Sequence, residues 1–184
     1  MQADQLNITL RRASPLDAPF VDQIRNQPTT RRFQASPQRT IQQITEMLSE
    51  GLSGPLTRTS MGRFYWIALA NGDPAGMVQL AIDQRDRSQE SGTLGYTIAE
   101  PYQGLGIATV AVTKMLAIAF DPSCLAIQRL EAVAAVGNLA SRRVLEKTGF
   151  QFEGIQRGLL IIDGQRVDHA CYAMLESDEM ARRK

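Results

Sequence analysis

A glycine-rich turn between a strand-like and a helix-like segment constrains this chain more than any other feature. Residues 93–98 (TLGYTI) alternate in polarity, which predicts a strand. Residues 107–120 are apolar nearly all round, with Lys114 their only charge, which predicts a helix buried against a sheet. The turn that ends the strand and starts the helix is Gln103, Gly104, Leu105, Gly106, Ile107, Ala108 and Thr109.

Such a turn is suited to bind an anion. The first N–H groups of a helix have no partner within the helix, and the helix dipole places partial positive charge there. Gly104 and Gly106 let a ligand approach the backbone closely. A phosphate or pyrophosphate fits this environment, while a tight loop that only starts a helix is the simpler alternative. The turn lacks the lysine of a Walker loop, and Thr109 stands where a dinucleotide fingerprint has its third glycine.

Composition is that of an ordinary water-soluble domain. We expect one domain over residues 1–184, with a core from about 6 to 175 and a charged tail, 176–184, that frays. The net charge of +1 gives no reason to expect nucleic-acid or membrane binding. The two cysteines lack metal-ligand spacing, and the N-terminus lacks a signal peptide, so we expect a cytoplasmic protein without a metal.

The first half of the chain predicts a strand, two helices and a hairpin. The pattern indicates a strand at 7–11, a helix that starts at Ser14-Pro15 and ends before Pro28, a second helix from Ser36-Pro37 to about Gly51, and paired strands at 63–69 and 75–82. Residues 29–33 are interpreted as a linker with one buried aromatic, or as a wall of a substrate cleft. Residues 83–90 are expected to form a charged loop.

The second half predicts one parallel crossover followed by a hairpin. Its expected elements are a strand at 128–136, a helix at 138–147 with Arg142 and Glu146 on its solvated face, extended pieces at 150–154 and 159–162, and a last strand at 167–175. The whole order favours a mixed α/β (α+β) fold with one mostly antiparallel sheet and helices on both faces. Ligands bind at the carboxyl ends of strands in such crossovers, where the anion turn lies.

Two motifs in order resemble the GNAT superfamily of N-acetyltransferases. Gln103, Gly106 and Ala108 match its Gln/Arg-x-x-Gly-x-Gly/Ala loop for acyl-CoA. The block from Asn138 to Phe150 (NLASRRVLEKTGF) resembles the second signature of its RimJ/RimL-like branch. Gly95-Tyr96 before the loop is similar to that branch as well.

The resemblance implies acetyl-CoA-dependent transfer to a primary amine on a GNAT-like fold. It implies that the backbone of Tyr96, Thr97 and Ile98 pairs with the pantetheine arm and that residues 103–109 hold the pyrophosphate. Asn138 would contact the cofactor near the thioester, or cap its helix, or both. Ser141 would supply the proton to the leaving thiolate, in place of a tyrosine where this chain has Leu145; an ordinary helix-surface serine is the alternative.

The general base is not defined by the sequence. Related sequences often carry glutamates where this chain has Thr93 and Val110. The remaining candidates are Asp168, Glu131 and His169, the only histidine. A free α-amine, with a pKa near ~8, needs little help from a base.

Three hypotheses follow. The first is an N-acetyltransferase whose acceptor is a protein N-terminal α-amine or a small-molecule amine; several arginines in the first helices disfavour a polycation. The second is a non-catalytic acyl-CoA-binding or sensing module, because Thr93, Val110 and Leu145 replace reactive groups. The third is a nucleotide-binding regulator that rests on the glycine turn alone. A monomer or a homodimer is compatible with the sequence.

Overall fold

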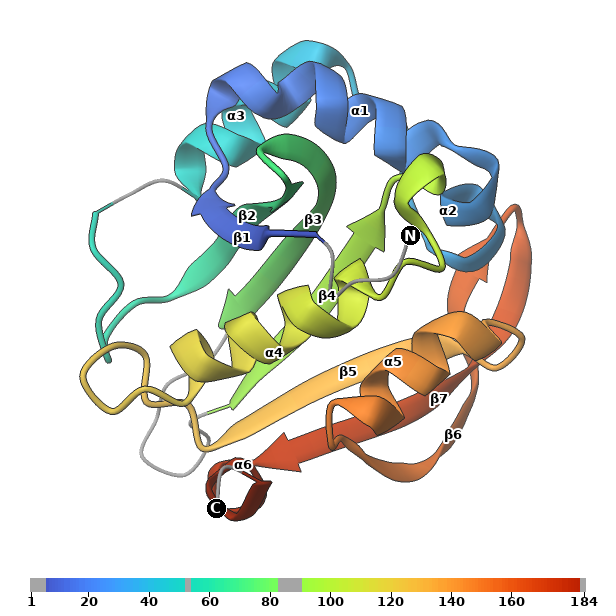
Figure 1. Ribbon diagram of the computed structural model, residues 1–184. Helices are drawn as coiled ribbons and strands as arrows, with labels where there is room; N and C mark the ends of the chain where they lie inside the picture. Colours follow the sequence, from blue (N-terminus) through green and yellow to red (C-terminus); the bar gives the residue numbers. More distant parts are fainter. Residues whose placement is uncertain (1–5, 52–53, 83–90, 183–184) are drawn as a thin grey trace.

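A seven-stranded sheet forms the centre of the computed structural model, which describes residues 6–51, 54–82 and 91–182 (Figure 1). The order across the sheet is β1-β2-β3-β4-β5-β7-β6, and only β4 and β5 pair in parallel. The strands are β1 (Ile8–Arg12), β2 (Gly62–Ala70), β3 (Asp73–Ile82), β4 (Ser91–Ile98), β5 (Arg129–Ala135), β6 (Gln151–Ile162) and β7 (Gln165–Leu175). This confirms the mixed, mostly antiparallel sheet predicted from the sequence.

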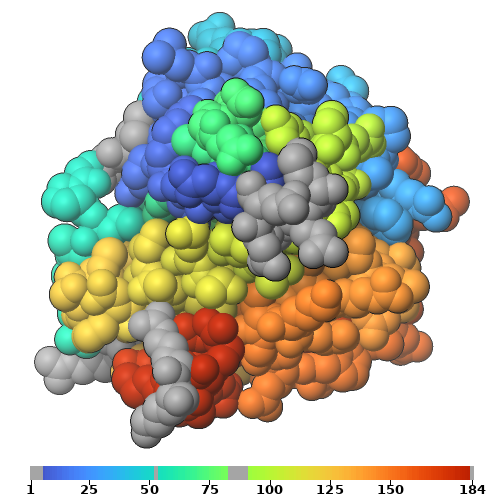
Figure 2. All heavy atoms as spheres, viewed as in Figure 1, coloured from blue at the N-terminus to red at the C-terminus, as the bar shows by residue number. Residues whose placement is uncertain are grey.

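Helices cover both faces of the sheet. The α-helices are α1 (Ala18–Asn26), α2 (Pro28–Phe33), α3 (Ile41–Glu50), α4 (Ile107–Ala119), α5 (Leu139–Lys147) and α6 (Glu176–Arg182), with short 3-10 turns at η2 (Pro15–Asp17) and η3 (Glu100–Tyr102). Figure 2 shows the face formed by α4 and α5, with α6 beside them. None of the described helices is long and apolar enough to cross a membrane.

Strand β2 shows how the two layers are built. Its residues are buried on both sides, so it reads as a nearly continuous apolar run. Phe64 and Trp66 pack in the larger core with α4, whereas Tyr65 and Ile67 pack with α1 and α3 in a second core. Alternation along a strand thus separates an α4–α5 layer from an α1–α3 layer.

The first helical region differs from the prediction in two ways. Residues 28–33 form helix α2 rather than a linker, because Pro28 occupies the first helical position and Gln34 N–H closes the turn on Thr30. Helix α3 begins at Ile41 rather than after Ser36-Pro37, because Thr40 and Gln43 form the capping box.

The C-terminal region also differs. The extended pieces at 150–154 and 159–162 belong to one strand, β6, whose pairing with β7 is irregular after Phe152 and Gln156. The tail expected to fray forms helix α6, where Glu179 is buried and pairs with Arg182 at 2.7 Å. The charged loop expected at 83–90 lies outside the described residues.

A buried carboxylate organises the entry to α1. Asp17 is 6% exposed and accepts hydrogen bonds from Arg11 at 2.6 and 2.8 Å and from the Ser14 N–H at 2.8 Å. The Arg11 hydrogen bond lowers the pKa of Asp17, against the opposing effect of burial. The ionised form therefore favours the folded state.

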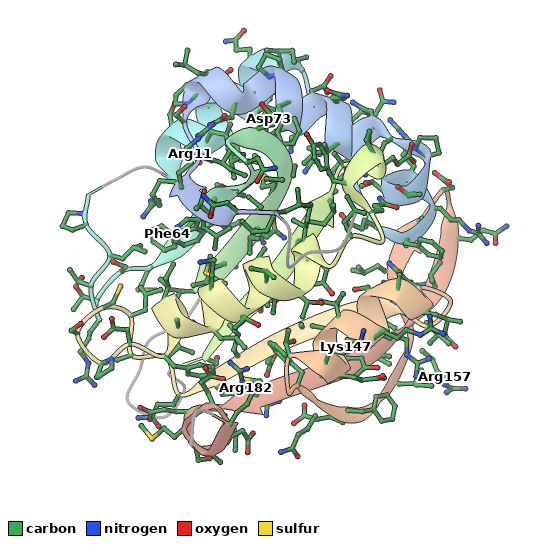
Figure 3. The ribbon with its side chains drawn as sticks, in the orientation of Figure 1. Arg11, Phe64, Asp73, Lys147, Arg157 and Arg182 are labelled. Carbon is green, nitrogen blue, oxygen red and sulfur yellow. The ribbon has the colours of Figure 1, made fainter. Side chains whose placement is uncertain are left out.

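We predict that Asp17→Asn lowers the free energy of unfolding at pH 7 by about 1–3 kcal/mol, because charged hydrogen bonds are lost. Since the folded pKa lies below the unfolded value of about 3.9, this stabilisation is present above that pH and is lost as pH falls through the folded pKa. Urea denaturation of the wild-type protein and of Asp17→Asn between pH 7 and pH 3 should show that the difference in their free energies of unfolding decreases. Asp73→Asn, at the exposed start of β3, is the matched control and should show no such difference in the free energy of unfolding (Figure 3).

Candidate functional site

The central feature of the site is a gap where β4 and β5 part. They pair only between Ser91–Thr93 and Arg129–Glu131, and then diverge (Figure 1). The rest of β5 pairs with β7 on its other edge, so the carboxyl half of β4 pairs with β3 on one edge and has no strand on the edge that faces β5. Side-chain amides reach the carbonyls exposed in this way: Gln34 donates to Tyr96 O at 3.1 Å, and Gln27 donates to Ile98 O at 2.8 Å.

The backbone of β4 therefore presents polar groups to the gap at alternate residues. In an antiparallel ladder, the N–H and C=O of one residue point to the same edge. The N–H groups of Tyr96 and Ile98 thus share the gap edge with their carbonyls. Thr97, between them, has a hydroxyl that donates to Gln34 at 3.1 Å.

The predicted anion turn has the required geometry. Gly104 and Gly106 both have positive φ, 76° and 81°, and Gly106 is the N-cap of α4. No side chain caps the N-terminus of α4, and its first turn contains no acidic residue. A Cβ at Gly104 would meet none of the described residues within 4 Å, apart from its chain neighbours, so the space beside this glycine is open. The side chain of Gln103 instead binds Thr29 and the Ile98 carbonyl, fixing the turn to β4 and α2.

A hydroxyl pair lies where α5 approaches β4. Tyr96 Oη is 2.9 Å from Ser141 Oγ and 3.1 Å from the Ser141 carbonyl oxygen. Burial raises the pKa of Tyr96 to about 12, so its hydroxyl stays protonated and donates. Asn138 caps α5 by accepting from the Ser141 N–H at 3.1 Å. The cap role of Asn138 is therefore present, and Asn138 also lines the cavity described next.

A cavity of about 220 Å³ passes through the gap from one layer to the other. Asn138, Ser141 and Tyr96 line it on the α5 side. The other side of the cavity faces the α1–α3 layer. Its walls there come from helices α1 and α2 and from four strands of the sheet, and they are Arg25, Phe33, Gln79, Val133, Leu160 and His169. The two ends of the cavity therefore open toward different helical layers.

His169 presents a free ring nitrogen to this cavity. It is 2% exposed, and its Nδ1 lies 2.8 Å from the Val167 carbonyl oxygen. A carbonyl can only accept, so Nδ1 carries the proton and Nε2 is an acceptor in the neutral ring. Among described residues, the only fully enclosed side-chain nitrogen or oxygen without a partner is Arg12 Nε. No described residue forms a hydrogen bond with Nε2 of His169. Because His169 lines the cavity, this nitrogen faces it.

The other candidate bases lie elsewhere. Asp168 accepts from the Gly158 N–H at 2.7 Å and fixes the β6–β7 hairpin. Glu131 pairs with Arg129 at 2.9 Å. Leu145 is fully buried in the core, so no reactive group replaces the tyrosine of related sequences there.

Glu146 is exposed and Arg142 half-buried on α5, in keeping with the solvated face that the helical spacing predicted, but both side chains also bind a buried tyrosine. Arg142 Nε donates to the Tyr172 hydroxyl at 3.1 Å, and that hydroxyl donates to Glu146 at 2.9 Å. Because Tyr172 is 1% exposed, these bonds satisfy a buried polar group and fix α5 on β7.

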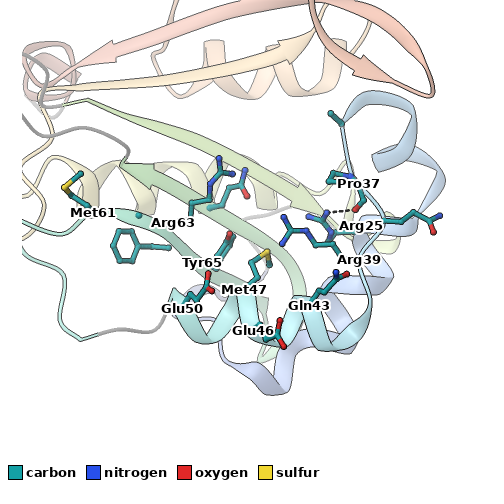
Figure 4. A pocket seen from close by; sticks show the side chains of 15 residues that line it. Arg25, Pro37, Arg39, Gln43, Glu46, Met47, Glu50, Met61, Arg63 and Tyr65 are labelled. Atoms are coloured by element: carbon teal, nitrogen blue, oxygen red, sulfur yellow. Dashed lines mark hydrogen bonds between the residues drawn. The ribbon is translucent and has the colours of Figure 1, made fainter.

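An outer basin of about 870 Å³ adjoins the cavity on the α1–α3 side (Figure 4). Arg25, Ala35 and Gln79 line both spaces. Gln79 lies over Gly95, where an added Cβ would come within 2.6 Å of its amide nitrogen. The basin is thus the entrance to the cavity from the side opposite α5.

Sequence reasoning missed the glutamines that shape this site. Gln27, Gln34 and Gln79 are single polar residues without a motif, and each acts on a strand distant in sequence. Gln27 alone joins Thr30, the Ile98 carbonyl and the Glu100 N–H. Their role becomes clear only once the structure shows which edge of β4 lacks a partner strand.

The chain belongs to the acetyltransferase (GNAT) domain family, whose profile matches residues 7–151. It is 38% identical over 111 residues to the putative ribosomal N-acetyltransferase YdaF of Bacillus subtilis (strain 168), which is 60% of this chain and 58% of that protein. It is 35% identical over 85 residues to the [Ribosomal protein uS5]-alanine N-acetyltransferase of Escherichia coli (strain K12), covering 46% and 43%. These matches confirm the resemblance to the RimJ/RimL-like branch, and they span about half the length of these relatives.

The fold agrees with this membership. A crystal structure of a probable acetyltransferase superposes with a TM-score of 0.77 at 27% identity, covering 96% of this chain and 97% of that one. The seven-stranded sheet with helices on both faces is thus a known architecture.

We predict that Gly104→Ala weakens CoA binding by more than its effect on stability explains. The substitution strains a positive-φ position by about 1–2 kcal/mol and places a methyl group where a phosphate would approach the backbone. Gly164→Ala is the matched control, because Gly164 has φ 77° and equally open surroundings in a distant hairpin turn. Calorimetry should show a CoA affinity loss of at least tenfold for Gly104→Ala alone; equal affinities would show that the turn binds no phosphate.

Proposed function

We propose that this protein transfers the acetyl group of acetyl-CoA to the primary amine of an acceptor, a protein N-terminus or a small molecule. The single observation that carries the proposal is the cavity through the gap, with a donor hydroxyl at one end and an acceptor nitrogen at the other. Membership of the GNAT family and the names of its relatives support the same reaction.

The residues present fit acetyl-CoA. The N-terminus of α4, with the turn 103–109, offers N–H groups for the pyrophosphate. The β4 edge offers Tyr96 and Ile98 backbone groups for the amides of the pantetheine arm, with Thr97 between them. Asn138 and Ser141 would lie near the thioester. Acetyl-CoA supplies the acyl group as a thioester that an amine can attack.

Each proton in the reaction has a residue suited to move it. Nε2 of His169 accepts the proton that the acceptor ammonium must lose before it can attack. A β4 backbone N–H that faces the gap stabilises negative charge on the carbonyl oxygen. Tyr96 donates to the Ser141 carbonyl oxygen and lies 2.9 Å from Ser141 Oγ, so it orients the Ser141 hydroxyl, which donates its proton to the departing sulfur.

We predict that Ser141→Ala lowers kcat by about 100-fold with little change in the KM for acetyl-CoA, as expected for loss of a general acid. Helix α5 should remain folded, because Asn138 caps a backbone N–H that the substitution keeps. Thiol release with a panel of amines measures the effect, and Ser49→Ala, a serine on α3 outside both spaces, is the control. An unchanged kcat would assign Ser141 to the helix surface. A folded protein that binds CoA but acetylates no amine would instead support the non-catalytic binding module.

We predict that the defect of His169→Gln depends on the basicity of the acceptor. An amine with a pKa near ~10 is almost fully protonated at pH 7, whereas one near ~8 has a useful neutral fraction. Loss of the base should therefore reduce kcat/KM more for the basic acceptors in a series of amines graded in pKa. A purely structural role for His169 would reduce all members of the series by the same factor.

A further inference from the structure

The outer basin is lined by charged side chains of both signs. They are Arg25, Arg39 and Arg63, together with Glu46 and Glu50 from α3. Arg25 and Arg39 lie side by side near Pro37 in Figure 4, and Glu46 and Glu50 lie toward α3. Arg25 alone among these five charged residues also lines the inner cavity. The charge nearest to the reacting centre is therefore positive.

Among the described residues, no carboxylate forms an ion pair with either of the two neighbouring arginines, although Asp22 lies close enough to Arg25 to raise its pKa in part. Arg25 donates to the Pro37 carbonyl at 3.1 Å. Arg25 is half-buried and Arg39 is exposed. Burial lowers the pKa of Arg25, and the charge of Arg39 lowers it further, so an anion between them would relieve both effects. Guanidinium groups match carboxylates in shape and bind them through paired hydrogen bonds.

The floor of the basin concentrates this positive field. Tyr65 is 5% exposed, and burial raises its pKa; Arg63, Arg39 and Arg25 oppose that rise, and Glu50 adds to it with the smallest effect. All three arginines therefore act on one point of the floor. By contrast, the described residues that line the inner cavity include no aspartate or glutamate to bind a second cationic group.

We propose that Arg25 and Arg39 bind a carboxylate of the acceptor, so that the preferred acceptors are amines with a carboxylate close to the amine. This inference rests on the proposed function and names its substrate class. The carboxylate has two sources, the α-carboxylate of a free amino acid or an acidic side chain at the second position of a peptide. A polyamine has no such group and would bring further positive charge to the arginines.

Two matched pairs of acceptors test the proposal. The first is L-alanine and L-alaninamide, and the second is the peptide amides Ala-Asp-Gly and Ala-Asn-Gly. A nearby anion stabilises the ammonium form, so intrinsic reactivity at a fixed pH favours the neutral member of each pair. We expect the carboxylate member of at least one pair to have a kcat/KM higher by about 10- to 100-fold, the effect of a charged hydrogen bond. The pair that shows the preference identifies the source.

The arginine variants assign the preference to the site. Arg39→Gln and Arg25→Gln should raise the KM of the carboxylate acceptor by about tenfold more than that of its neutral partner, while Arg39→Lys should retain part of the preference. Arg157→Gln is the control, because Arg157 points away from the molecule on β6 (Figure 3). A neutral acceptor or spermidine that reacts as fast as the carboxylate acceptors overturns the proposal, as does a preference that survives in both arginine variants.

A binding measurement separates this proposal from the transfer reaction itself. Calorimetry of the N-acetylated members of each pair, added to the CoA-loaded protein, requires no turnover. Tighter binding of an acetylated carboxylate member, lost in Arg39→Gln, supports the proposal even if every amine is inert in the thiol-release assay. Equal binding of both members in each pair, in a protein that binds CoA and acetylates amines, overturns the carboxylate site while leaving the acetyltransferase function intact.

Discussion

The separation of β4 from β5 after Thr93 and Glu131 is the constraint on which the rest of the structure depends. A parallel pair that continued to Ile98 would satisfy its own backbone and leave no passage through the sheet. Instead, β5 pairs with β7, and β4 is left with an open edge. Exposed strand edges must be covered or satisfied, and here glutamine side chains from the α2 region and the turn after η3 satisfy them.

The passage gives the two helical layers different tasks. The α4–α5 layer supplies helix N-termini, a positive-φ turn and hydroxyl groups, all of which depend on local backbone geometry. The α1–α3 layer supplies side chains of varied charge on segments between helices, such as Arg39 and Gln34. Loops on a rigid scaffold can change such side chains without disturbing the sheet. In the proposals made above, cofactor binding therefore lies on one side of the sheet and acceptor selection on the other.

This division explains what could be predicted from the sequence. The turn at 103–109, the cap at Asn138 and the crossover are local patterns, and the structure has them where they were expected. Helix α2 was missed because six residues with two threonines and two arginines show no apolar period, and its position depends on Gln27 binding β4. The start of α3 was misplaced because Ser36-Pro37 and Thr40-x-x-Gln43 are both start signals, and only the second forms its bonds. The Arg142–Tyr172–Glu146 contact joins α5 to β7 across 26 residues or more, which spacing on one helix cannot reveal.

Helix α2 lies next to both the edge of β4 proposed for the pantetheine arm and the acceptor side of the cavity. Gln27 precedes it and Gln34 follows it, and both donate to β4 carbonyls on the edge proposed for the pantetheine arm. Phe33, the last residue of the helix, walls the cavity on the acceptor side. A carbonyl oxygen has two lone pairs, so an incoming amide can share Tyr96 O with Gln34 or displace it. Sharing keeps α2 in place, whereas displacement frees Gln34 and its bond to Thr97. Any ligand that competes for these carbonyls therefore acts on the same short helix that shapes the acceptor side of the cavity.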